Sequence, residues 1–363
     1  MANAWATSSK AMKVNKLRQQ RKKEHLLLAR RGARCSFASL FSDIRLPHNC
    51  LTEVNPHDVD LRATLCGYSV AAPLYLNAMT GGTLAAEHVN RQLARAAAKF
   101  NLPIAVGSQS SGLRSRGLRF TYQVVRKYNP HGLIMANLSA HASLREARAA
   151  VEMLEAQILQ LHLNPVQEFI MPEGECIPPG LVDNIADICA GLSVPVLVKE
   201  VGFGIGSAQA KTLAAAGVKA IDVSGSGGTN FARIEGRRNA STWWKPLADW
   251  GLPTPLCLID LAVNASDLEY LASGGVDDGI RALKCLALGA GAVGIAGAVL
   301  RALPAGVEDF LSAYLRQLRV GMALLGAAAV ADLRTIPLYI TGTLRDLALA
   351  RGIDPAFFGT RGG

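Results

Sequence analysis

The chain contains the stretch ILQLHLNPVQE at residues 158–168. Apolar and polar residues alternate over 159–164, and this period of two predicts a short strand with one apolar and one polar side. Pro165 cannot donate to a sheet and ends the strand, so Gln167 and Glu168 are expected in the loop that follows. An imidazole, two carboxamides and a carboxylate therefore gather at one strand end. A barrel enzyme needs such a set, whereas a plain surface strand does not.

Seven further short apolar runs accompany this one, and most of them alternate with stretches of helical pattern. Strand–helix alternation predicts a parallel sheet, and eight repeats predict an α/β fold of the TIM (β/α)8 barrel type. A doubly wound open sheet is the competing architecture. Glycine and polar residues follow the runs, which places them at the barrel mouth, where active sites of this fold are built. The eight runs cover residues 74–79, 102–106, 133–136, 158–163, 194–198, 218–223, 268–272 and 292–296.

Length and pattern predict one domain with additions to the barrel. The chain has 363 residues, which is ordinary for a single α/β barrel with extra segments. We expect an N-terminal basic helical arm and extra C-terminal helices. The predicted parts are a loose tail (1–13), an arm and cap (14–73) with a helix over about 14–31, the barrel (74–303), and C-terminal helices packed on it (304–363).

The charge of the chain is strongly basic, at a formal +10. Part of the excess is local, because residues 10–34 contain ten Lys and Arg against the single acid Glu24. Such a balance attracts nucleic acid, anionic membranes or phosphorylated small molecules, although a solvated helix is the plain alternative. No aromatic residue interleaves with these charges, which argues against single-stranded nucleic acid as a partner.

The cysteines and the hydropathy pattern predict the cellular compartment of the protein. The seven cysteines are scattered without metal-ligand spacing, which favours reduced thiols in a cytoplasmic protein. No stretch has the length of a membrane span, and the first residues lack a signal-peptide core. We therefore expect a cytoplasmic protein with no membrane and no nucleic-acid partner.

Two glycine turns predict a phosphate site. Ser273-Gly274-Gly275 follows the seventh run and Gly294–Gly297 follows the eighth, which is where this fold usually holds a phosphate on backbone N–H groups. Close helix–sheet packing of small residues is the alternative. A third glycine cluster at 202–206 resembles a dinucleotide loop only weakly, because it lacks the full spacing.

Lys199 ends a strongly apolar strand. A buried lysine is costly unless it meets an anion or a ring oxygen. It could form a Schiff base, hold a flavin ring or simply reach solvent. Residues 221–230 form another turn of the ligand-binding type, with a flexible Gly/Ser loop as the alternative.

The cluster at 162–168 is best interpreted as a whole. His162 alone could be a core histidine, and Glu168 alone could be a surface acid. Together with Asn164 and Gln167 they indicate a polar site for an anionic ligand or Mg²⁺, which binds one or two carboxylates along with phosphate oxygens and water.

These turns together resemble one family closely, the flavin-dependent type 2 isopentenyl-diphosphate isomerases. The resemblance extends in order and at consistent spacing over roughly residues 15–350. Each matching stretch alone is weak evidence, but the whole series is highly specific for this family. The matching stretches are RKKEH (21–25), NAMTGG (77–82), GSQ (107–109), HLN (162–164), QE (167–168), MPEG (171–174), VKEVGFG (198–204), DVSG (222–225), GTNF (228–231), DWG (249–251) and LALGA (286–290).

The resemblance implies FMN at the mouth of the barrel and a diphosphate substrate beside it. Substrate-binding residues are expected to be Arg21, Lys22, Ser108, Gln109, His162, Asn164 and Gln167, with Glu168 on Mg²⁺. The expected FMN contacts are Ala78, Met79, Thr80, Ser108, Asn137, Lys199, Ser224 and Thr229, and the expected FMN phosphate contacts are Gly274, Gly275, Val276, Ala296 and Gly297.

The sequence departs from the family pattern in three places. The family usually has Arg after the Gly274-Gly275 turn and Asp four residues later, whereas this chain has Asp277 and Arg281. Opposite charges at i and i+4 can pair on a helix, so we predict a swapped salt bridge. Ser139 stands where the family usually has Gly, and Glu175-Cys176 stands where it typically has Asp-Arg.

The resemblance implies reversible conversion of isopentenyl diphosphate to dimethylallyl diphosphate in isoprenoid biosynthesis. Reduced FMN would act as acid and base, with Gln167 beside the reacting carbons and His162 and Asn164 near the diphosphate. NADPH would serve only to reduce FMN, and a homo-oligomer, a tetramer or octamer, is expected. The alternatives are a net-redox FMN barrel oxidoreductase, such as a hydroxy-acid oxidase or dehydrogenase, and a flavin-binding protein without turnover.

Overall fold

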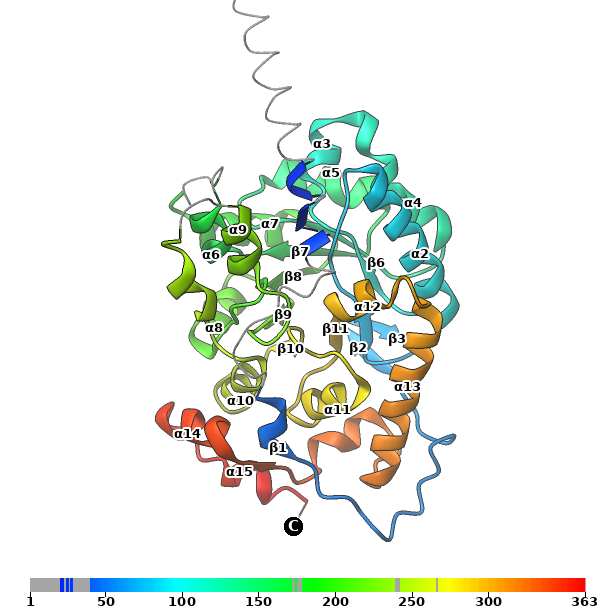
Figure 1. Ribbon diagram of the computed structural model, residues 1–363, viewed down its shortest axis with the longest axis vertical. Helices are drawn as coiled ribbons and strands as arrows, with labels where there is room; N and C mark the ends of the chain where they lie inside the picture. The colour runs from blue at the N-terminus through cyan, green and yellow to red at the C-terminus, as the bar shows by residue number, and fades with distance from the viewer. Residues whose placement is uncertain are drawn as a thin grey trace, which may run out of the picture.

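The computed structural model describes residues 20–22, 24, 25, 27, 28, 40–171, 174, 178–238, 242–265 and 267–362. Eight parallel strands form one sheet in the order β10-β9-β8-β7-β6-β5-β4-β11 (Figure 1). They are β4 (Leu74–Leu76), β5 (Ile104–Ala105), β6 (Ile134–Ser139), β7 (Ile158–His162), β8 (Val196–Lys199), β9 (Ala220–Asp222), β10 (Glu269–Leu271) and β11 (Val293–Ile295).

The sheet closes on itself. The last strand β11 pairs with the first strand β4, Val293 lying opposite Leu74, and a parallel bridge joins Ala272 to Val293 across the remaining gap. An open doubly wound sheet would leave two free edges here, so that alternative is wrong and the predicted TIM barrel is confirmed.

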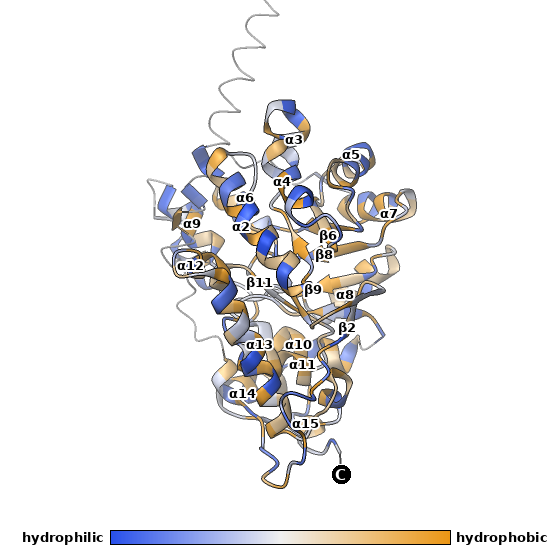
Figure 2. Ribbon diagram, turned by 90° about the vertical axis from the view of Figure 1, so that its right-hand side faces the viewer, coloured by the Kyte–Doolittle hydropathy of each residue, from blue (hydrophilic) through white to orange (hydrophobic). Residues whose placement is uncertain are grey.

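Helices surround the barrel because each has one apolar side to bury. In α2, Val89, Leu93 and Ala97 recur at intervals of four and are buried, as an amphipathic helix on a core requires. In Figure 2 the helix ribbons mix polar and apolar colours, whereas β8 is mainly apolar. The helices of this layer are α2 (Leu84–Phe100), α3 (Ser110–Arg114), α4 (Phe120–Tyr128), α5 (Leu144–Leu154), α6 (Pro165–Ile170), α7 (Leu181–Gly191), α8 (Ser207–Ala215), α9 (Phe231–Arg238), α10 (Thr254–Asn264), α11 (Gly279–Ala287) and α12 (Gly297–Ala302).

The hairpin β2 (Ala63–Leu65) and β3 (Tyr68–Val70) fills the amino-terminal end of the barrel. Its Leu65 and Val70 share a buried apolar cluster with Met135 and other residues near the strand starts. The backbone N–H of its Cys66 donates to the Glu269 carboxylate at 2.9 Å. Ligand binding is therefore left to the opposite, carboxyl-terminal end.

The chain beyond the barrel is helical, as predicted. Helices α13 (Val307–Leu324), α14 (Gly342–Ala350) and α15 (Ala356–Gly359) follow it, and both views place α14 and α15 at the opposite end of the molecule from α3 (Figures 1 and 2). Strand β12 (Tyr339–Ile340) pairs antiparallel with β1 (Ile44–Arg45). Short 3-10 helices cover Phe41–Asp43, Arg116–Leu118, Lys245–Asp249 and Val330–Arg334.

The N-terminal predictions are tested only in part. The predicted tail 1–13 lies outside the described residues. Within the predicted helix 14–31, the described residues 20–22, 24, 25, 27 and 28 are all helical, and we call them the arm. The domain boundaries themselves stay predictions. No described helix is both long and apolar enough to cross a membrane.

The loop expected after Pro165 is instead helix α6, so that detail of the sequence interpretation was wrong. Pro165 occupies the first turn of the helix, where its missing N–H has no partner to lose and its fixed φ favours the helix. Gln167 and Glu168 therefore lie on a short helix. The long connection after β9 likewise contains α9.

Candidate active site

A cavity of about 750 Å³ opens at the carboxyl ends of the barrel strands. Its volume lies within the range of roughly 300–1,000 Å³ that is typical of ligand sites. Every one of the eight strand ends contributes to its wall. The contributions include Asn77, Ser108, Asn137, His162, Lys199, Ser224, Ser273 and Ile295.

The predicted site residues meet in this cavity with one exception. All of them line it apart from Gln109. The Gln109 side chain is fully buried; it donates to the backbone carbonyl of Ala150 at 2.9 Å and accepts from the Asn137 N–H at 2.9 Å. It therefore holds helix α5 against β6, behind the cavity wall.

The predicted phosphate end depends on glycine. Gly274 and Gly275 have positive φ angles of 94° and 81°, which favour glycine. A Cβ on Gly274 would lie 2.1 Å from the Gly225 carbonyl oxygen, so the turns after β9 and β10 pack backbone to backbone.

Gly297 differs, because a Cβ there would meet only two polar side-chain atoms. They are Thr229 Oγ1 at 2.9 Å and Arg301 Nη1 at 3.1 Å. Space bordered by a hydroxyl, a guanidinium and bare backbone suits a phosphate group. The phosphate end (Gly274, Gly275, Val276, Ala296 and Gly297) thus fits the group that the resemblance implied.

The predicted Asp277–Arg281 pair is present, but it is not the closer contact. Arg281 Nη1 lies 3.5 Å from Asp277 Oδ2, whereas Arg301 Nη2 donates to Asp277 Oδ1 at 2.9 Å. Arg301 also lines the cavity and Arg281 does not. Sequence reasoning missed Arg301, although its place four residues after Gly297 puts it on the same helix side.

Lys199 is buried, so the interpretation in which it reaches solvent was wrong. Its Nζ donates to the backbone carbonyl of Glu200 at 2.5 Å. Burial lowers the pKa of Lys199, while Asp222 and Glu200 oppose that shift. Sheet register sets Lys199 beside His162 on one side and Asp222 on the other, which brings three strand ends together under the cavity.

Glu200 has an unusual hydrogen-bond arrangement. Its Oε2 accepts the N–H groups of Val201, Gly202 and Phe203 at 2.6, 2.7 and 2.5 Å, but within the described chain its buried Oε1 has no hydrogen-bond partner. Burial raises the pKa of Glu200 to about 7, with these N–H groups and Lys199 acting in the opposite direction.

We expect the Glu200→Gln variant to remove a pH dependence of stability. A carboxyl with a pKa raised above its unfolded value stabilises the fold below pH 4.5, and this contribution is lost as pH rises through 7. Relative to Glu200→Gln, the wild type should therefore lose about 3 kcal/mol of unfolding free energy between pH 4.5 and 8. Urea unfolding of both proteins at pH 5 and 8 measures this, and parallel behaviour of the two would contradict the assignment.

The cluster after β7 is held by internal hydrogen bonds. Asn164 Nδ2 donates to Glu168 Oε1 at 2.9 Å, and Gln167 Nε2 donates to Glu235 Oε1 at 2.8 Å. Burial, followed by the Lys199 charge, lowers the pKa of His162 to about 3. His162 is therefore neutral at physiological pH and acts through hydrogen bonds.

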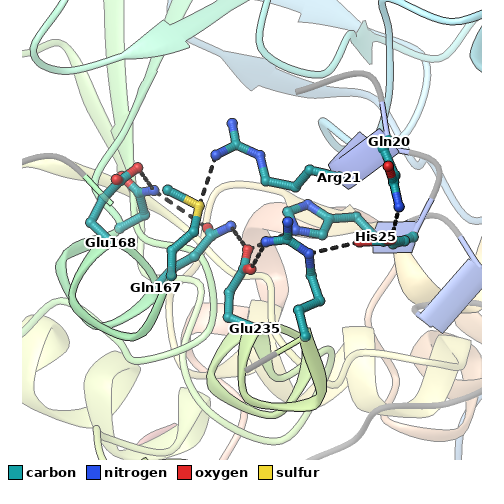
Figure 3. A network of polar contacts seen from close by, with 10 residues as sticks. Gln20, Arg21, His25, Gln167, Glu168 and Glu235 are labelled. Carbon is teal, nitrogen blue, oxygen red and sulfur yellow. Dashed lines mark hydrogen bonds and ion pairs between the residues drawn. The ribbon is translucent and has the colours of Figure 1, made fainter. Parts of the chain in front are cut away.

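Glu235 joins this cluster to the arm (Figure 3). It is fully buried, His25 Nε2 lies 2.6 Å from its Oε1, and Arg238 Nη1 lies 2.5 Å from its Oε2. Arg238 also donates to Glu24 of the arm at 2.8 Å. Sequence reasoning missed Glu235; the only signal was a lone acid within the basic stretch 233–238.

Burial alone would raise the pKa of Glu235. The hydrogen bond and charge of His25 and the hydrogen bonds of Gln167 and Arg238 outweigh it, so the pKa falls to about 2. The carboxylate is thus ionised at every pH at which the protein would work.

The two basic residues of the arm, Arg21 and Lys22, line the cavity. Lys22 Nζ donates to Ser108 O, Ser111 Oγ and Tyr122 Oη at 3.0, 3.0 and 2.7 Å. Burial, and then the neighbouring Arg21, lower the Lys22 pKa to about 7. Arg21 Nη1 contacts Met171 Sδ at 2.8 Å (Figure 3).

Of the other two departures from the family pattern, the structure describes only Ser139. Ser139 lines the cavity, whereas Glu175 and Cys176 lie outside the described residues. Within the described ranges, no group of three or more His, Cys, Asp and Glu side chains is arranged to hold a metal.

Glycine turns and the buried Lys199 line the mouth of this closed barrel. Residues 36–115 and 111–338 match the family described as FMN-dependent dehydrogenase, and the chain belongs to it. Solved structures agree on the fold. A flavocytochrome b2 with pyruvate bound superposes with a TM-score of 0.64 at 19% identity, covering 85% of this chain and 78% of that one. A mandelate oxidase superposes with a TM-score of 0.62 at 19% identity, covering 86% and 94%.

Relatives with higher sequence identity identify the family within this class of FMN-dependent proteins. A protein of Listeria monocytogenes named isopentenyl-diphosphate delta-isomerase is 41% identical over 343 residues, which is 93% of this chain and 96% of the relative. A protein of the same name from Nocardia farcinica is 44% identical over 325 residues, covering 88% and 90%. The chain belongs to the isopentenyl-diphosphate delta-isomerase family, as the sequence motifs predicted.

Proposed function

We propose that this protein interconverts isopentenyl diphosphate and dimethylallyl diphosphate in isoprenoid biosynthesis. The observation that carries the proposal is a cavity lined by two different sets of residues. One set is the glycine turns, Thr229 and Lys199, and the other is the basic residues of the arm and the cluster after β7. The first set suits a flavin, and the second suits a small diphosphate.

The reaction adds a proton at one carbon of the substrate and removes one from another, so there is no net gain of electrons. An isolated alkene is a very weak base and needs a strong, well-placed acid. Reduced FMN, when bound, would supply the proton donor and acceptor and an electron-rich face. The residues expected to hold it are the cavity residues Ala78, Met79, Thr80, Ser108, Asn137, Lys199, Ser224 and Thr229, along with the phosphate end.

The diphosphate would lie between the arm and helix α6. Arg21 and Lys22 supply positive charge there, and an arriving anion would raise the Lys22 pKa again and so strengthen its own binding. His162 and Asn164 supply neutral hydrogen-bonding groups. Glu168 supplies the carboxylate for Mg²⁺, whose other ligands would be phosphate oxygens and water.

Gln167 is the member of the cluster that we place beside the reacting carbons. Its amide is uncharged, so it orients and does not transfer protons. The bond to Glu235 fixes its amino group, which leaves the amide carbonyl, 3.4 Å from Asn164 Nδ2, as the remaining acceptor.

Three finer expectations belong to this proposal. NADPH would be needed only to reduce FMN, because the isomerisation consumes no electrons. The protein would be cytoplasmic, and it would assemble as a homo-oligomer, a tetramer or octamer. Of these, the first follows from the proposed chemistry, the second from the scattered cysteines, and the third from the family resemblance.

The proposal is tested by anaerobic incubation of the purified protein with FMN, Mg²⁺, NADPH and isopentenyl diphosphate. We expect many dimethylallyl diphosphate molecules per flavin, with NADPH consumed only once per flavin. NADPH or oxygen consumed in step with product would indicate a net-redox enzyme instead. Absence of dimethylallyl product at any enzyme level would overturn the proposal.

Changing Glu168 to glutamine should raise the Mg²⁺ concentration needed for half-maximal activity by roughly tenfold or more, because a neutral amide is a weaker Mg²⁺ ligand than a carboxylate. The matched control is Glu146→Gln. Glu146 also lines the cavity, but its carboxylate accepts from Ser143 in a capping box that glutamine can replace. Equal Mg²⁺ responses of the two variants would contradict the role of Glu168.

Arg301→Met should weaken FMN binding by about 10- to 100-fold, as expected for one lost charged hydrogen bond. Riboflavin, which lacks the phosphate, should bind equally well to variant and wild type. Arg319→Met is the control, because Arg319 donates to the backbone carbonyl of Val59 and does not line the cavity. Fluorescence titration with both flavins measures the constants, and equal weakening for both would indicate a packing role only.

A further inference from the structure

A continuous chain of side-chain hydrogen bonds runs beneath the cavity from Asp222 to His162. Asn77 Nδ2 donates to Asp222 Oδ2 at 2.8 Å, and Gln160 Nε2 donates to Asn77 Oδ1 at 3.1 Å. Asn137 Nδ2 donates to Gln160 Oε1 at 2.8 Å, and Asn137 Oδ1 lies 3.1 Å from His162 Nδ1. The chain crosses from β9 to the end of β4, then to β7 and β6, and back to β7.

Two members of the hydrogen-bond chain, Asp222 and Gln160, are shielded from the cavity, whereas Asn77 and Asn137 line it. Asp222, Gln160, Asn137 and Asn77 are at most 2% exposed. Asp222 and Gln160 do not line the cavity, whereas His162 does. An effect of Gln160 on His162 must therefore pass through the side chains between them.

Asp222 determines which group donates and which accepts in every hydrogen bond of this series. A carboxylate has only acceptor atoms, and Asp222 also accepts from Tyr75 Oη at 2.7 Å, Ser273 Oγ at 2.7 Å and the Ser224 N–H at 3.1 Å. Burial, and then the Asp222 charge, raise the pKa of Tyr75 far above its usual value, so the phenol keeps its proton and donates it. Four donors converge on this one carboxylate.

Each carboxamide along the chain has one donor end and one acceptor end. Because Asn77 gives its amino group to Asp222, its carbonyl faces Gln160, and the Ala78 N–H holds that carbonyl in place at 2.8 Å. Gln160 then turns its carbonyl to Asn137, and Asn137 turns its carbonyl to His162. Because the Asn137 carbonyl oxygen can only accept, the nitrogen that faces it, His162 Nδ1, must carry a proton.

We propose that this chain, anchored by Asp222, fixes the tautomer of His162, and that Gln160 is a positioning residue for it. His162 carries its single proton on Nδ1, which leaves Nε2 as an acceptor. The ring can then bind a hydrogen-bond donor in the cavity, such as water or a protonated phosphate oxygen. Its place beside a diphosphate rests on the proposed function, but its tautomer does not.

The test is the ¹⁵N spectrum of FMN-loaded protein labelled in its histidine rings. A His162→Asn variant identifies the His162 signals among those of the seven histidines. The wild type should show a protonated Nδ1 and a bare Nε2. The Gln160→Met substitution interrupts the series of hydrogen bonds. The ratio of the Nε2–H to the Nδ1–H tautomer of His162 should therefore rise by about tenfold, which corresponds to the free energy of one hydrogen bond.

Gln160→Glu is the matched control. A buried, protonated Glu keeps a carbonyl for Asn137 and a hydroxyl for Asn77, so it should retain the wild-type tautomer. An unchanged tautomer in Gln160→Met would show that local contacts of the ring, such as the Leu138 backbone, set it instead and would overturn the proposal. A wild-type Nε2–H would also overturn it. Lack of isomerase activity would affect only the proposed function, because the spectrum needs no turnover.

Discussion

Lys199→Met is expected to lower kcat by about 100-fold or more, the usual scale for losing one preorganised charged group in an active site. Lys199 places a buried ammonium in the cavity wall, and its Nζ is held by the backbone carbonyl of Glu200. Methionine has similar length and no charge, so the change removes the positive charge and little else. A second readout is the flavin potential, which should become more negative when this cation is lost.

The control for this result is Lys284→Met. Lys284 is also partly buried and also donates to a backbone carbonyl, that of Phe41 at 2.7 Å, but it does not line the cavity. Its kcat should stay within about twofold of the wild type, since changes away from functional features have small effects. Full activity of Lys199→Met, or an equal loss in both variants, would refute the assigned role.

Glu235→Gln should cost about 3 kcal/mol of unfolding free energy at pH 7, because breaking a buried ion pair leaves its partner uncompensated. The partner here is Arg238, whose contact with the ionised Glu235 carboxylate would be lost. Activity should fall as well, because glutamine keeps only one of the two acceptor oxygens that bind Gln167 and Arg238.

The effect of Glu235→Gln should vanish in acid. The pKa of Glu235 is lowered to about 2 by bonds that outweigh the effect of burial, so its stabilisation is present above pH 4.5 and is lost as pH falls towards 2. Urea unfolding at pH 7 and pH 2 measures the difference. The control is Glu308→Gln, whose exposed pair with Lys99 should contribute no more than about 1 kcal/mol. A difference that persists at pH 2 would contradict the ionic role of Glu235.

The barrel was predictable because its signals are local. Alternation around His162 and glycine after each apolar run depend on burial and backbone conformation within a few residues. The same locality explains why nearly all predicted site residues meet in one cavity, since parallel strands present their carboxyl ends together.

What could not be predicted depends on which way a side chain faces and on distant partners. Ser108 and Gln109 follow the same strand, but only Ser108 faces the cavity. Arg301 and Glu235 were missed because their partners are 24 and 68 residues away. Residue type and spacing do not reveal such pairings.

The pairing of β1 with β12 bears on the order in which the molecule can be completed. The Thr341 hydroxyl donates to the Asp43 carbonyl across 298 residues of sequence, and the Leu344 N–H donates to the Asp43 carboxylate. During synthesis, residues 41–45 emerge early and have no partner until almost the whole barrel has been made. Contacts of such long sequence separation form late in folding. The pairing of β1 with β12 therefore forms last, and nascent chains interrupted before residue 339 leave β1 without its strand partner.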